Sequence, residues 1–276
     1  MGATGVGRVG SRRENGSGNL RETAMKVASP PSLFLALIEA PRAISEASTL
    51  IPTHPFLNNL APGDGHAVMT LPGFLATDRS MSVMRQYLKR WGYDARRWRL
   101  GRNVGLNRQW TLEKLLDRRL KALFAESGGK VSLIGRSLGG LYAREMARRN
   151  PQYVRNVITL GSPIGEPKAT SIWRLYEYVS GVSISDQEIR KRIDLLRDPI
   201  PDVPVTAIYS KSDAIVSWEI ATIPAGRQVE NIGINTSHIG MGFNPAVFFA
   251  LADRLRLAEG CWEPFEISGF RKLFYH

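Results

Sequence analysis

The sequence is poor in cysteine and has no long apolar run. Its 276 residues include a single cysteine, Cys261, which excludes an intramolecular disulfide and a zinc site built from cysteines. A lone cysteine also fits a reducing compartment, so we expect a cytoplasmic protein. No apolar run reaches the roughly 18 residues needed to cross a bilayer. The composition, 43% hydrophobic and 22% charged, is that of a globular chain with a core of its own.

Acidic residues are fewer than basic ones, 25 against 37, which gives a formal net charge of +12. Residues 1–130 contain 20 Lys/Arg and 10 Asp/Glu, whereas residues 131–276 contain 17 and 15. The basic side chains recur at helical spacing, as in Arg85, Lys89 and Arg90, so we interpret them as a solvated helix face. Peripheral contact with an anionic membrane is the alternative. Aromatic residues do not alternate with the basic ones, which argues against a nucleic-acid partner.

The first 26 residues are rich in Gly, Ser and Arg and lack an apolar period, so we predict that residues 1–26 are disordered. The nearest apolar stretch, residues 33–38, is short and is followed at once by an acidic residue. We therefore expect no secretory leader. Met25 is an alternative start to Met1. A helix is predicted to open at Ser32 and to be interrupted at Pro41.

Short apolar runs alternate with helical patterns from residue 62 to residue 257. The predicted strands are 66–71, 94–100, 130–134, 154–160, 204–210 and 228–234. The predicted helices among them are 81–91, 110–126, 138–149 and 245–257. Apolar strands separated by helices are typical of a parallel sheet covered on both faces. We therefore expect one α/β domain over residues 27–276, with a mostly parallel sheet of roughly six strands.

Two segments depart from this alternation. Residues 163–202 separate two strands by about forty residues, far more than a usual connection, and contain a helical pattern at 185–196. We interpret residues 163–202 as a helical cap or lid insertion. Residues 258–276 carry several aromatic side chains that need a surface to cover, so we expect this tail to pack on the domain.

A glycine–serine motif follows the third predicted strand directly. Residues 135–139 read Gly-Arg-Ser-Leu-Gly, with an apolar strand before them and an amphipathic helix after them. In such a G-x-S-x-G turn the serine has strained backbone angles and its hydroxyl projects above the sheet, while the glycines leave room for the helix. The helix N-terminus also favours the negative charge that develops in acyl transfer. We predict that Ser137 is a nucleophile.

A serine hydroxyl needs a base, and the base needs an orienting acid. After a nucleophile elbow these partners follow in the order acid, histidine. Besides the C-terminal histidine, only His238 follows Ser137, and it lies in a loop just after the last predicted strand. Among several acidic residues between the two, Asp213 alone follows the carboxyl end of a strand, where ligands bind in open α/β sheets. We predict that Asp213 and His238 serve Ser137.

Two backbone amides are expected to hold the oxyanion. One belongs to Leu138, which follows the nucleophile, and the other to Phe74, in a turn that ends the first predicted strand. An ordinary turn is the competing interpretation for Phe74. Gly161-Ser162 follows the next strand, but Pro163 prevents an elbow there, so we interpret this turn as pocket lining. The expected apolar pocket residues are Trp173, Tyr176 and Tyr178 of the insertion, together with Trp218 and Met241.

These motifs resemble the α/β-hydrolase superfamily, and within it the bacterial lipases and carboxylesterases. The resemblance covers about 70% of the chain and rests on Ile134 to Gly140, Gly161 to Pro163, Ser212 to Val216 and Ser237-His238. It implies a serine hydrolase with Ser137, Asp213 and His238 as the catalytic triad and with no metal or organic cofactor. The chain departs from the family at Pro72-Gly73, where many secreted lipases have His-Gly. It also has a predicted helix before His66, where the family usually has its first β-hairpin.

We therefore expect an enzyme that cleaves carboxylic esters with an apolar acyl or alcohol part through an acyl-enzyme. Its partner would be a small-molecule or lipid ester. An acyltransferase or a thioesterase would use the same intermediate with another acceptor. A non-catalytic binding protein of this fold at anionic membranes is the alternative from a different class. The sequence contains no signal for an oligomeric state.

Overall fold

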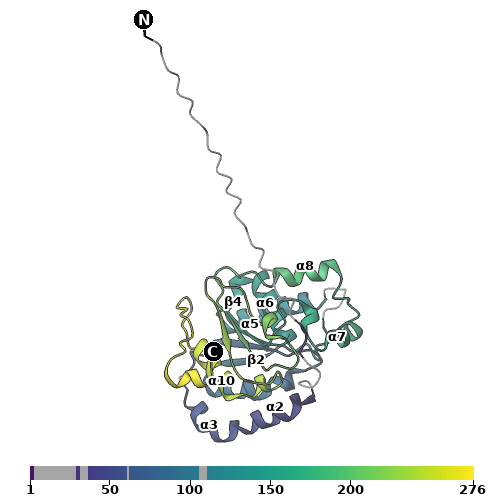
Figure 1. Cartoon of the computed structure of the whole chain (residues 1–276). Helices are drawn as coiled ribbons and strands as arrows, with labels where there is room; N and C mark the ends of the chain where they lie inside the picture. Colours follow the sequence, from purple (N-terminus) through teal and green to yellow (C-terminus); the bar gives the residue numbers. More distant parts are fainter. Residues whose placement is uncertain (3–28, 32–36, 61, 106–110) are drawn as a thin grey trace.

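The computed structural model describes residues 1–2, 29–31, 37–60, 62–105 and 111–276 (Figure 1). Apart from Met1 and Gly2, the predicted disordered segment lies outside the described residues. The same holds for Ser32 and Trp110, where two of the predicted helices begin. The described part nevertheless contains the whole stretch from the first strand to the last, so the sheet can be compared with its prediction.

Six parallel strands form one sheet in the order β2-β1-β3-β4-β5-β6. Their bounds are β1 Ala67–Leu71, β2 Asp94–Arg97, β3 Val131–Arg136, β4 Val154–Leu160, β5 Val205–Tyr209 and β6 Val229–Gly233. Each lies within a predicted strand or within two residues of its end, and the predicted α/β class is confirmed. Because the strand order reverses between β1 and β3, the crevice outside their carboxyl ends is the expected ligand site.

Helices cover both faces of this sheet. They are α2 Glu39–Ser48, α3 Leu50–Asn58, α4 Ser82–Arg90, α5 Thr111–Ser127, α6 Leu138–Arg149, α7 Trp173–Ser180, α8 Gln187–Leu195, α9 Trp218–Ala221 and α10 Pro245–Leu255. Short 3-10 turns are η1 Asp78–Met81, η2 Pro151–Tyr153, η3 Pro167–Ala169, η4 Gly240–Gly242 and η5 Gly269–Leu273. In Figure 1, α2 and α3 lie at the opposite edge of the molecule from α8. None of the helices in the described ranges is both long and apolar enough to span a bilayer.

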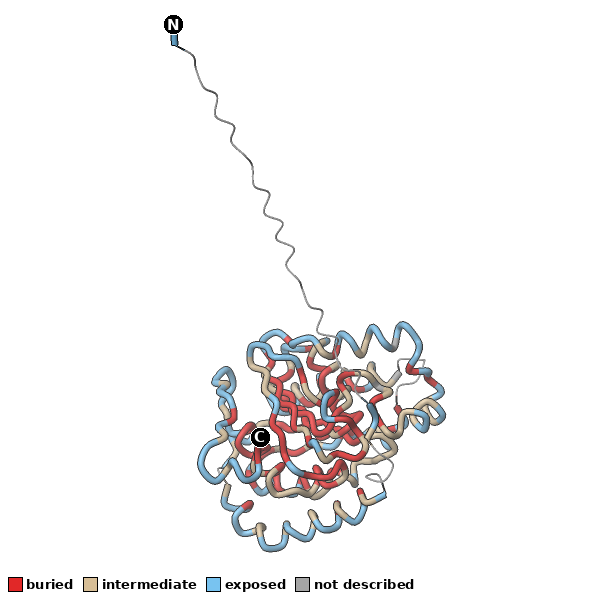
Figure 2. The backbone as a smooth tube through the Cα atoms, viewed as in Figure 1, coloured by how far each residue is buried: buried red, intermediate tan, exposed pale blue. Residues whose placement is uncertain are grey.

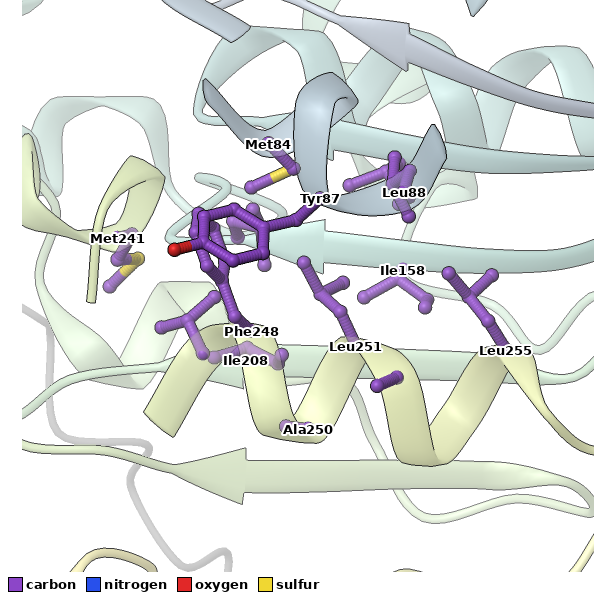
Figure 3. Packing of buried hydrophobic residues seen from close by; sticks show 14 of the residues in the cluster. Met84, Tyr87, Leu88, Ile158, Ile208, Met241, Phe248, Ala250, Leu251 and Leu255 are labelled. Carbon is purple, nitrogen blue, oxygen red and sulfur yellow. The ribbon is translucent and has the colours of Figure 1, made fainter. Parts of the chain in front are cut away.

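Alternate residues of the strands face two separate cores, because successive side chains of a strand point to opposite faces. On one face Val68 packs with α4 and α10, where the Tyr87 and Phe248 rings lie 4.9 Å apart (Figure 3). On the other face Met69 packs with α5 and α6 around Leu120. The buried residues in Figure 2 accordingly concentrate in the sheet and on the helix faces turned toward it.

Two predictions for the N-terminal half of the chain were wrong, namely the interruption of a helix at Pro41 and the exposure of Arg85. Pro41 lies in the first turn of α2, where its missing N–H costs nothing, and the helix runs through it. Arg85 does not lie on a solvated face with Lys89 and Arg90, since it is only 6% exposed. Its guanidinium is buried because it donates to Thr70 Oγ1 at 3.1 Å and to the carbonyl of Asp78 at 2.7 Å.

The insertion at residues 163–202 contains η3, α7 and α8 and is attached at both ends. Near its start, Thr170 and Val216 form an antiparallel bridge beside the loop that follows β5. Near its end, the buried Arg144 of α6 donates from Nε to the carbonyl of Leu196 at 2.6 Å. The insertion therefore lies next to α6 and beside the carboxyl end of β5.

The end of the C-terminal tail pairs with the chain at the end of β6. Tyr275 forms an antiparallel bridge with Ile234, just past β6, and is buried together with Phe265. The contact includes the last residue of β6, because Gly233 and His276 exchange N–H to carbonyl hydrogen bonds at 2.9 and 3.0 Å. Phe270 and Phe274 remain exposed, so only some of the tail aromatics pack on the domain.

Candidate active site

Ser137 lies between β3 and α6 in a strained backbone conformation, with φ 51° and ψ −126°. A non-glycine residue at positive φ costs energy and is maintained only by its surroundings. Here the Ser137 N–H donates to the carbonyl of Leu160 at 2.8 Å. A Cβ on Gly135 would collide with the backbone of Gly139, and one on Gly139 with the backbone of Leu71. Gly135 is therefore needed for β3 to pack against the start of α6, and Gly139 for α6 to pack against β1.

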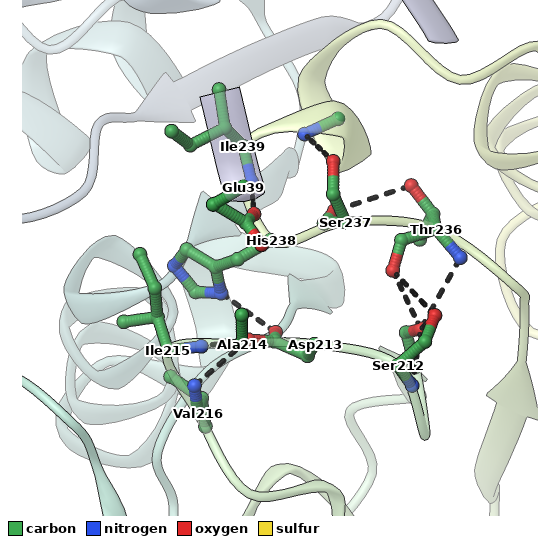
Figure 4. A network of polar contacts seen from close by, with 12 residues as sticks. Glu39, Ser212, Asp213, Ala214, Ile215, Val216, Thr236, Ser237, His238 and Ile239 are labelled. Carbon is green, nitrogen blue, oxygen red and sulfur yellow. Dashed lines mark hydrogen bonds and ion pairs between the residues drawn. The ribbon is translucent and has the colours of Figure 1, made fainter. Parts of the chain in front are cut away.

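The loops after β5 and β6 bring Asp213 and His238 into contact, with His238 Nδ1 2.7 Å from Asp213 Oδ2 (Figure 4). Both residues are buried. The other carboxylate oxygen, Asp213 Oδ1, accepts the N–H groups of Ile215 and Val216, each at 2.8 Å. The acid is therefore held in one orientation, and its contact with Nδ1 leaves Nε2 as the ring nitrogen free to act as a base.

The residue after β4 lies between the serine and this pair. A Cβ on Gly161 would lie 3.0 Å from Asp213 Oδ2 and 3.1 Å from His238 Nδ1, while the preceding Leu160 accepts the N–H of Ser137. The three predicted residues thus follow β3, β5 and β6 at one edge of the sheet. Within the described residues the Ser137 hydroxyl makes no hydrogen bond to His238, and such bonds are often long before substrate binds.

A second carboxylate, which the sequence reading missed, lies beside His238. Glu39 of α2 is 3% exposed, and its Oε1 accepts the N–H of Ile239 at 2.7 Å. Burial raises the pKa of Glu39, whereas the nearby His238 lowers it. Arg136, inside the serine motif, adds a cation: burial lowers the pKa of Arg136, and the neighbouring Asp213 and Glu39 oppose that effect. No local motif around Glu39 could have indicated this contact.

The turn that carries Phe74 lies against Ser137. A Cβ on Gly73 would lie 3.2 Å from Ser137 Cβ. Asn103, which the sequence reading also missed, fixes this turn: its Nδ2 donates to the carbonyl of Pro72 at 2.8 Å, and its carbonyl accepts from Leu75 at 2.7 Å. Leu138 is the first residue of α6, so its N–H has no intrahelical acceptor. Leu138 thus follows Ser137 directly, and the turn that contains Phe74 packs against Ser137.

A cavity of about 1040 Å³, including the space at its mouth, opens beside Ser137 and is largely apolar. One face of α6 forms its wall along the whole helix, with residues at positions 138, 141, 142, 145, 146 and 149. The insertion supplies further apolar lining through Trp173, Tyr176, Ile184, Ile193 and Leu196. Leu138 and Phe74 line the cavity together with Ser137, and the Phe74 and Tyr176 rings lie 5.3 Å apart.

Three of the predicted pocket residues lie elsewhere. Met241 is fully buried in the core with Phe248, because η4 turns its side chain into the sheet. Trp218 is 38% exposed at the start of α9 and lies beside the ring of Tyr209. Tyr178 is 88% exposed on α7. The expectation for these three rested on composition alone, which does not give the direction of a side chain.

The cavity ends in a set of ion pairs. Arg149 pairs with Glu113 at 2.8 Å and with Asp117, and Arg192 pairs with Glu113 and with Glu145 at 3.4 Å. All five line the cavity. Each of the two arginines pairs with two carboxylates, and the set lies beside the last turns of α6, so the largely apolar cavity is polar at the end remote from Ser137.

Ser162 is unsuited to be a second nucleophile. It is fully buried against Gly140, and its hydroxyl has no hydrogen-bond partner in the described part of the chain. Pro163 lines the cavity and Ser162 does not, so the pocket-lining interpretation of this turn holds only for Pro163. Over the same described ranges, no group of three His, Cys, Asp or Glu side chains is arranged to hold a metal ion.

The architecture is similar to that of solved lipases. Aspergillus fumigatus lipase B matches with a TM-score of 0.55 and 17% sequence identity, over 74% of this chain and 56% of that chain. The mature form of Bacillus licheniformis lipase BlEst2 matches with a TM-score of 0.53 and 16% identity, over 72% of this chain and 94% of that chain. A Paleococcus ferrophilus monoacylglycerol lipase matches with a TM-score of 0.52 and 14% identity, over 71% and 95%.

This chain therefore spans little more than half the length of the first lipase and nearly all of the other two. No family model matches the sequence, and no curated protein sequence is significantly similar to it. The similarity confirms the α/β-hydrolase fold that the sequence motifs predicted.

Proposed function

We propose that this protein is a serine hydrolase that cleaves carboxylic esters with a long apolar acyl chain. The observation that carries the proposal is the 2.7 Å contact between His238 Nδ1 and Asp213 Oδ2, on the sheet edge where Ser137 has its strained conformation. A buried acid that orients a histidine beside an activated serine is the arrangement that acyl transfer requires.

In the first step Ser137 Oγ attacks the ester carbonyl while His238 Nε2 takes the hydroxyl proton. Asp213 stabilises the resulting imidazolium without itself becoming protonated. The N–H groups of Leu138 and Phe74 hold the carbonyl oxygen as it becomes negative. The tetrahedral intermediate then breaks the bond to the alcohol oxygen, which leaves with the proton from His238, and the acyl group stays on Ser137.

In the second step water replaces the alcohol. His238 takes a proton from water as the water oxygen attacks the acyl carbon, and the same two N–H groups hold the oxygen again. The bond to Ser137 Oγ then breaks, and the proton on His238 returns to that oxygen. The products are a carboxylic acid and the free enzyme. An acceptor other than water would instead give acyl transfer.

The cavity along α6 supports an apolar acyl group as the substrate part that binds next to Ser137. The helix has 12 residues and is about 18 Å long at 1.5 Å per residue. An extended alkyl chain of about 14 carbons has this length, given C–C bonds of about 1.5 Å in a zigzag. The ion pairs of Arg149 and Arg192 at the remote end set an upper limit, since an alkyl chain gains nothing from contact with charges.

The test is hydrolysis of chromogenic esters of increasing acyl length by the wild type and by Ser137→Ala. We expect hydrolysis by the wild type and near-background rates for the variant, because the acyl group then has no nucleophile. A fluorophosphonate probe should label the wild type at Ser137 alone. Activity that survives the substitution, or labelling at another serine, would disprove the assignment. Transfer of the acyl group to an added alcohol or thiol in preference to water would favour an acyltransferase.

A further inference from the structure

One face of the helix α2 carries three charged residues that all reach the loops of Asp213 and His238. Glu39, Arg42 and Glu46 are spaced by three and four positions, so they share one side of the helix. α2 comes before the first strand of the sheet and contributes nothing to the cavity beside Ser137. Its contacts with the two loops therefore need a separate explanation.

The two backbone N–H groups on either side of His238 both donate to carboxylates of α2. Ser237 N–H donates to Glu46 Oε1 at 2.7 Å, and Ile239 N–H donates to Glu39 Oε1 at 2.7 Å (Figure 4 labels Glu39 and these loop residues). His238 is the only residue between these two anchors. Its backbone therefore cannot shift or rotate without breaking a hydrogen bond to a charged acceptor, which is stronger than one between neutral groups.

Glu46 fixes the same loop at two further points. Its Oε2 accepts the hydroxyl of Thr236 and, at 3.1 Å, the side-chain amide of Asn244, which caps α10. A Cβ on Gly240 would collide with this carboxylate, so the loop packs directly against it. One side chain thus joins the start and the end of the segment that carries His238.

The loop of the acid is held by the same helix. Arg42 donates to the carbonyl of Ser212 at 2.7 Å and to its hydroxyl at 2.9 Å. The Ser212 hydroxyl donates in turn to the carbonyl of Thr236 at 3.2 Å. Because Ser212 precedes Asp213, the helix α2 is bonded to the residue next to the acid as well as to both neighbours of His238.

We propose that α2 is a positioning element, in which Glu39, Arg42 and Glu46 fix the distance between Asp213 and His238 and aim the imidazole at Ser137. These residues touch neither substrate nor the reacting atoms, so they act through the two loops. The functional part of this inference rests on the proposed esterase activity, whereas the geometric part concerns the Asp213–His238 contact alone. Loops after parallel strands lack the hydrogen bonds of the sheet, and a separate helix supplies them here.

The experiment compares Glu39→Ala, Glu39→Gln, Glu46→Ala and the double alanine variant with the wild type. Gln at position 39 keeps an oxygen that accepts the N–H of Ile239, so it should restore most of what Ala loses. Ile44→Ala is the matched control, since Ile44 is exposed on the same helix. All kinetics are measured below the onset of thermal unfolding of the least stable variant, so that a loss of folded protein does not count as a loss of activity.

We expect each alanine variant to lower kcat about 10-fold and the double variant about 100-fold, as small displacements of reacting groups do. KM should change by less than about twofold, because the cavity is untouched. Glu39→Gln and Ile44→Ala should keep kcat near that of the wild type. Unchanged kcat in the double alanine variant, with only a lower melting temperature, would show that α2 merely stabilises the fold and would overturn the proposal.

A readout that needs no ester separates this inference from the proposed function. The Nδ1 proton of His238, hydrogen-bonded to Asp213, should give a low-field proton resonance that is absent in His238→Ala. We expect the resonance to broaden or shift in the double alanine variant and to persist in Glu39→Gln. If the wild type cleaves no ester but the resonance responds in this way, the esterase activity fails and the positioning role stands. A resonance unaffected by the double variant would refute the positioning role.

Discussion

Gly161 lies against the side chain of His238. It has φ +53°, and a Cβ at its position would lie 3.1 Å from His238 Nδ1, 3.0 Å from Asp213 Oδ2 and 2.9 Å from the sulfur of Met241. The end of β4 thus forms the floor under the acid–histidine contact. No side chain fits there without moving one of the three neighbours.

The substitution Gly161→Ala should therefore lower kcat about 100-fold, because the methyl group displaces the Asp213–His238 pair. The positive φ adds a stability cost of about 1 kcal/mol. Gly181→Ala is the control, since Gly181 also has positive φ (+67°) but no atom near its Cβ position. It should lose the same stability and no activity. Equal kcat in the two variants would contradict the placement of the pair against Gly161.

The course of the cavity along α6 predicts a change in chain-length preference. Leu141 lines the cavity one turn beyond Ser137, about 6 Å along the helix. Leu141→Trp should lower kcat/KM for long-chain esters at least about 10-fold, because the ring fills the space of the distal carbons. Acetyl and butyryl esters should be hydrolysed as by the wild type. Leu115→Trp, on the exposed side of α5, is the control. A uniform loss for all chain lengths would refute this acyl site.

The hydrogen bonds of Arg144 to the insertion lead to a prediction about stability. Its guanidinium is buried and donates to the carbonyls of Leu196 at 2.6 Å and Asp198 at 2.8 Å. Burial lowers the pKa of Arg144 to about 10, still a cation at neutral pH. Arg144→Met should cost about 3 kcal/mol, because the carbonyl of the buried Leu196 and that of Asp198 lose a charged donor. Urea unfolding measures this loss, and limited proteolysis should now cleave within residues 163–202. Arg148→Met, a more exposed neighbour on α6, should change stability by less than about 1 kcal/mol.

Because Tyr93 is buried, we expect the protein to lose stability at high pH. Burial raises the pKa of Tyr93 from its ordinary value to about 12, and its hydroxyl has no partner among the described residues. The pKa of Tyr93 is higher in the folded state than in the unfolded state. The free energy of unfolding is therefore unaffected by this group below pH 10 and decreases as the pH rises toward 12, because the unfolded state then loses the proton first.

Over that interval the wild type should therefore lose about 2 kcal/mol more than Tyr93→Phe, which has no group to ionise. At pH 7 the two proteins should be nearly equally stable, since Phe leaves no polar group unpaired. Urea unfolding at pH 7, 10, 11 and 12 measures the difference. Tyr178→Phe, at an exposed position, should parallel the wild type at every pH. An identical pH dependence for Tyr93→Phe would show that Tyr93 ionises freely in the folded state.

The strands and the serine turn were predictable because their signals are local. The apolar run before Gly135 dictates β3, and the glycine–serine motif is contained in five consecutive residues. The structure adds the reason for the glycines: a Cβ on Gly135 would collide with Gly139, and one on Gly139 with Leu71 of the neighbouring strand β1. The order of serine, acid and histidine along the chain selected His238, and the position after a strand selected Asp213 among several acids. The structure brings the two into contact. Their catalytic roles remain predictions to be tested with the variants above.

Contacts between distant segments were not predictable. Glu39 and Ile239 are separated by 200 positions, and the side chain of Arg85 is buried although its helix pattern suggested exposure. The sequence also could not tell that Met241 turns into the core and away from the cavity, because that direction depends on how η4 enters α10.

The sequence by itself determined a parallel α/β sheet with a glycine–serine turn after its third strand, since hydrophobic periodicity and the five-residue motif are read from a few neighbouring residues. Only the tertiary structure decided which side chains surround that elbow, where the cavity runs, and that α2 bonds to both loops. Such contacts form between segments far apart in the chain, and their energy depends on the packing of the whole domain.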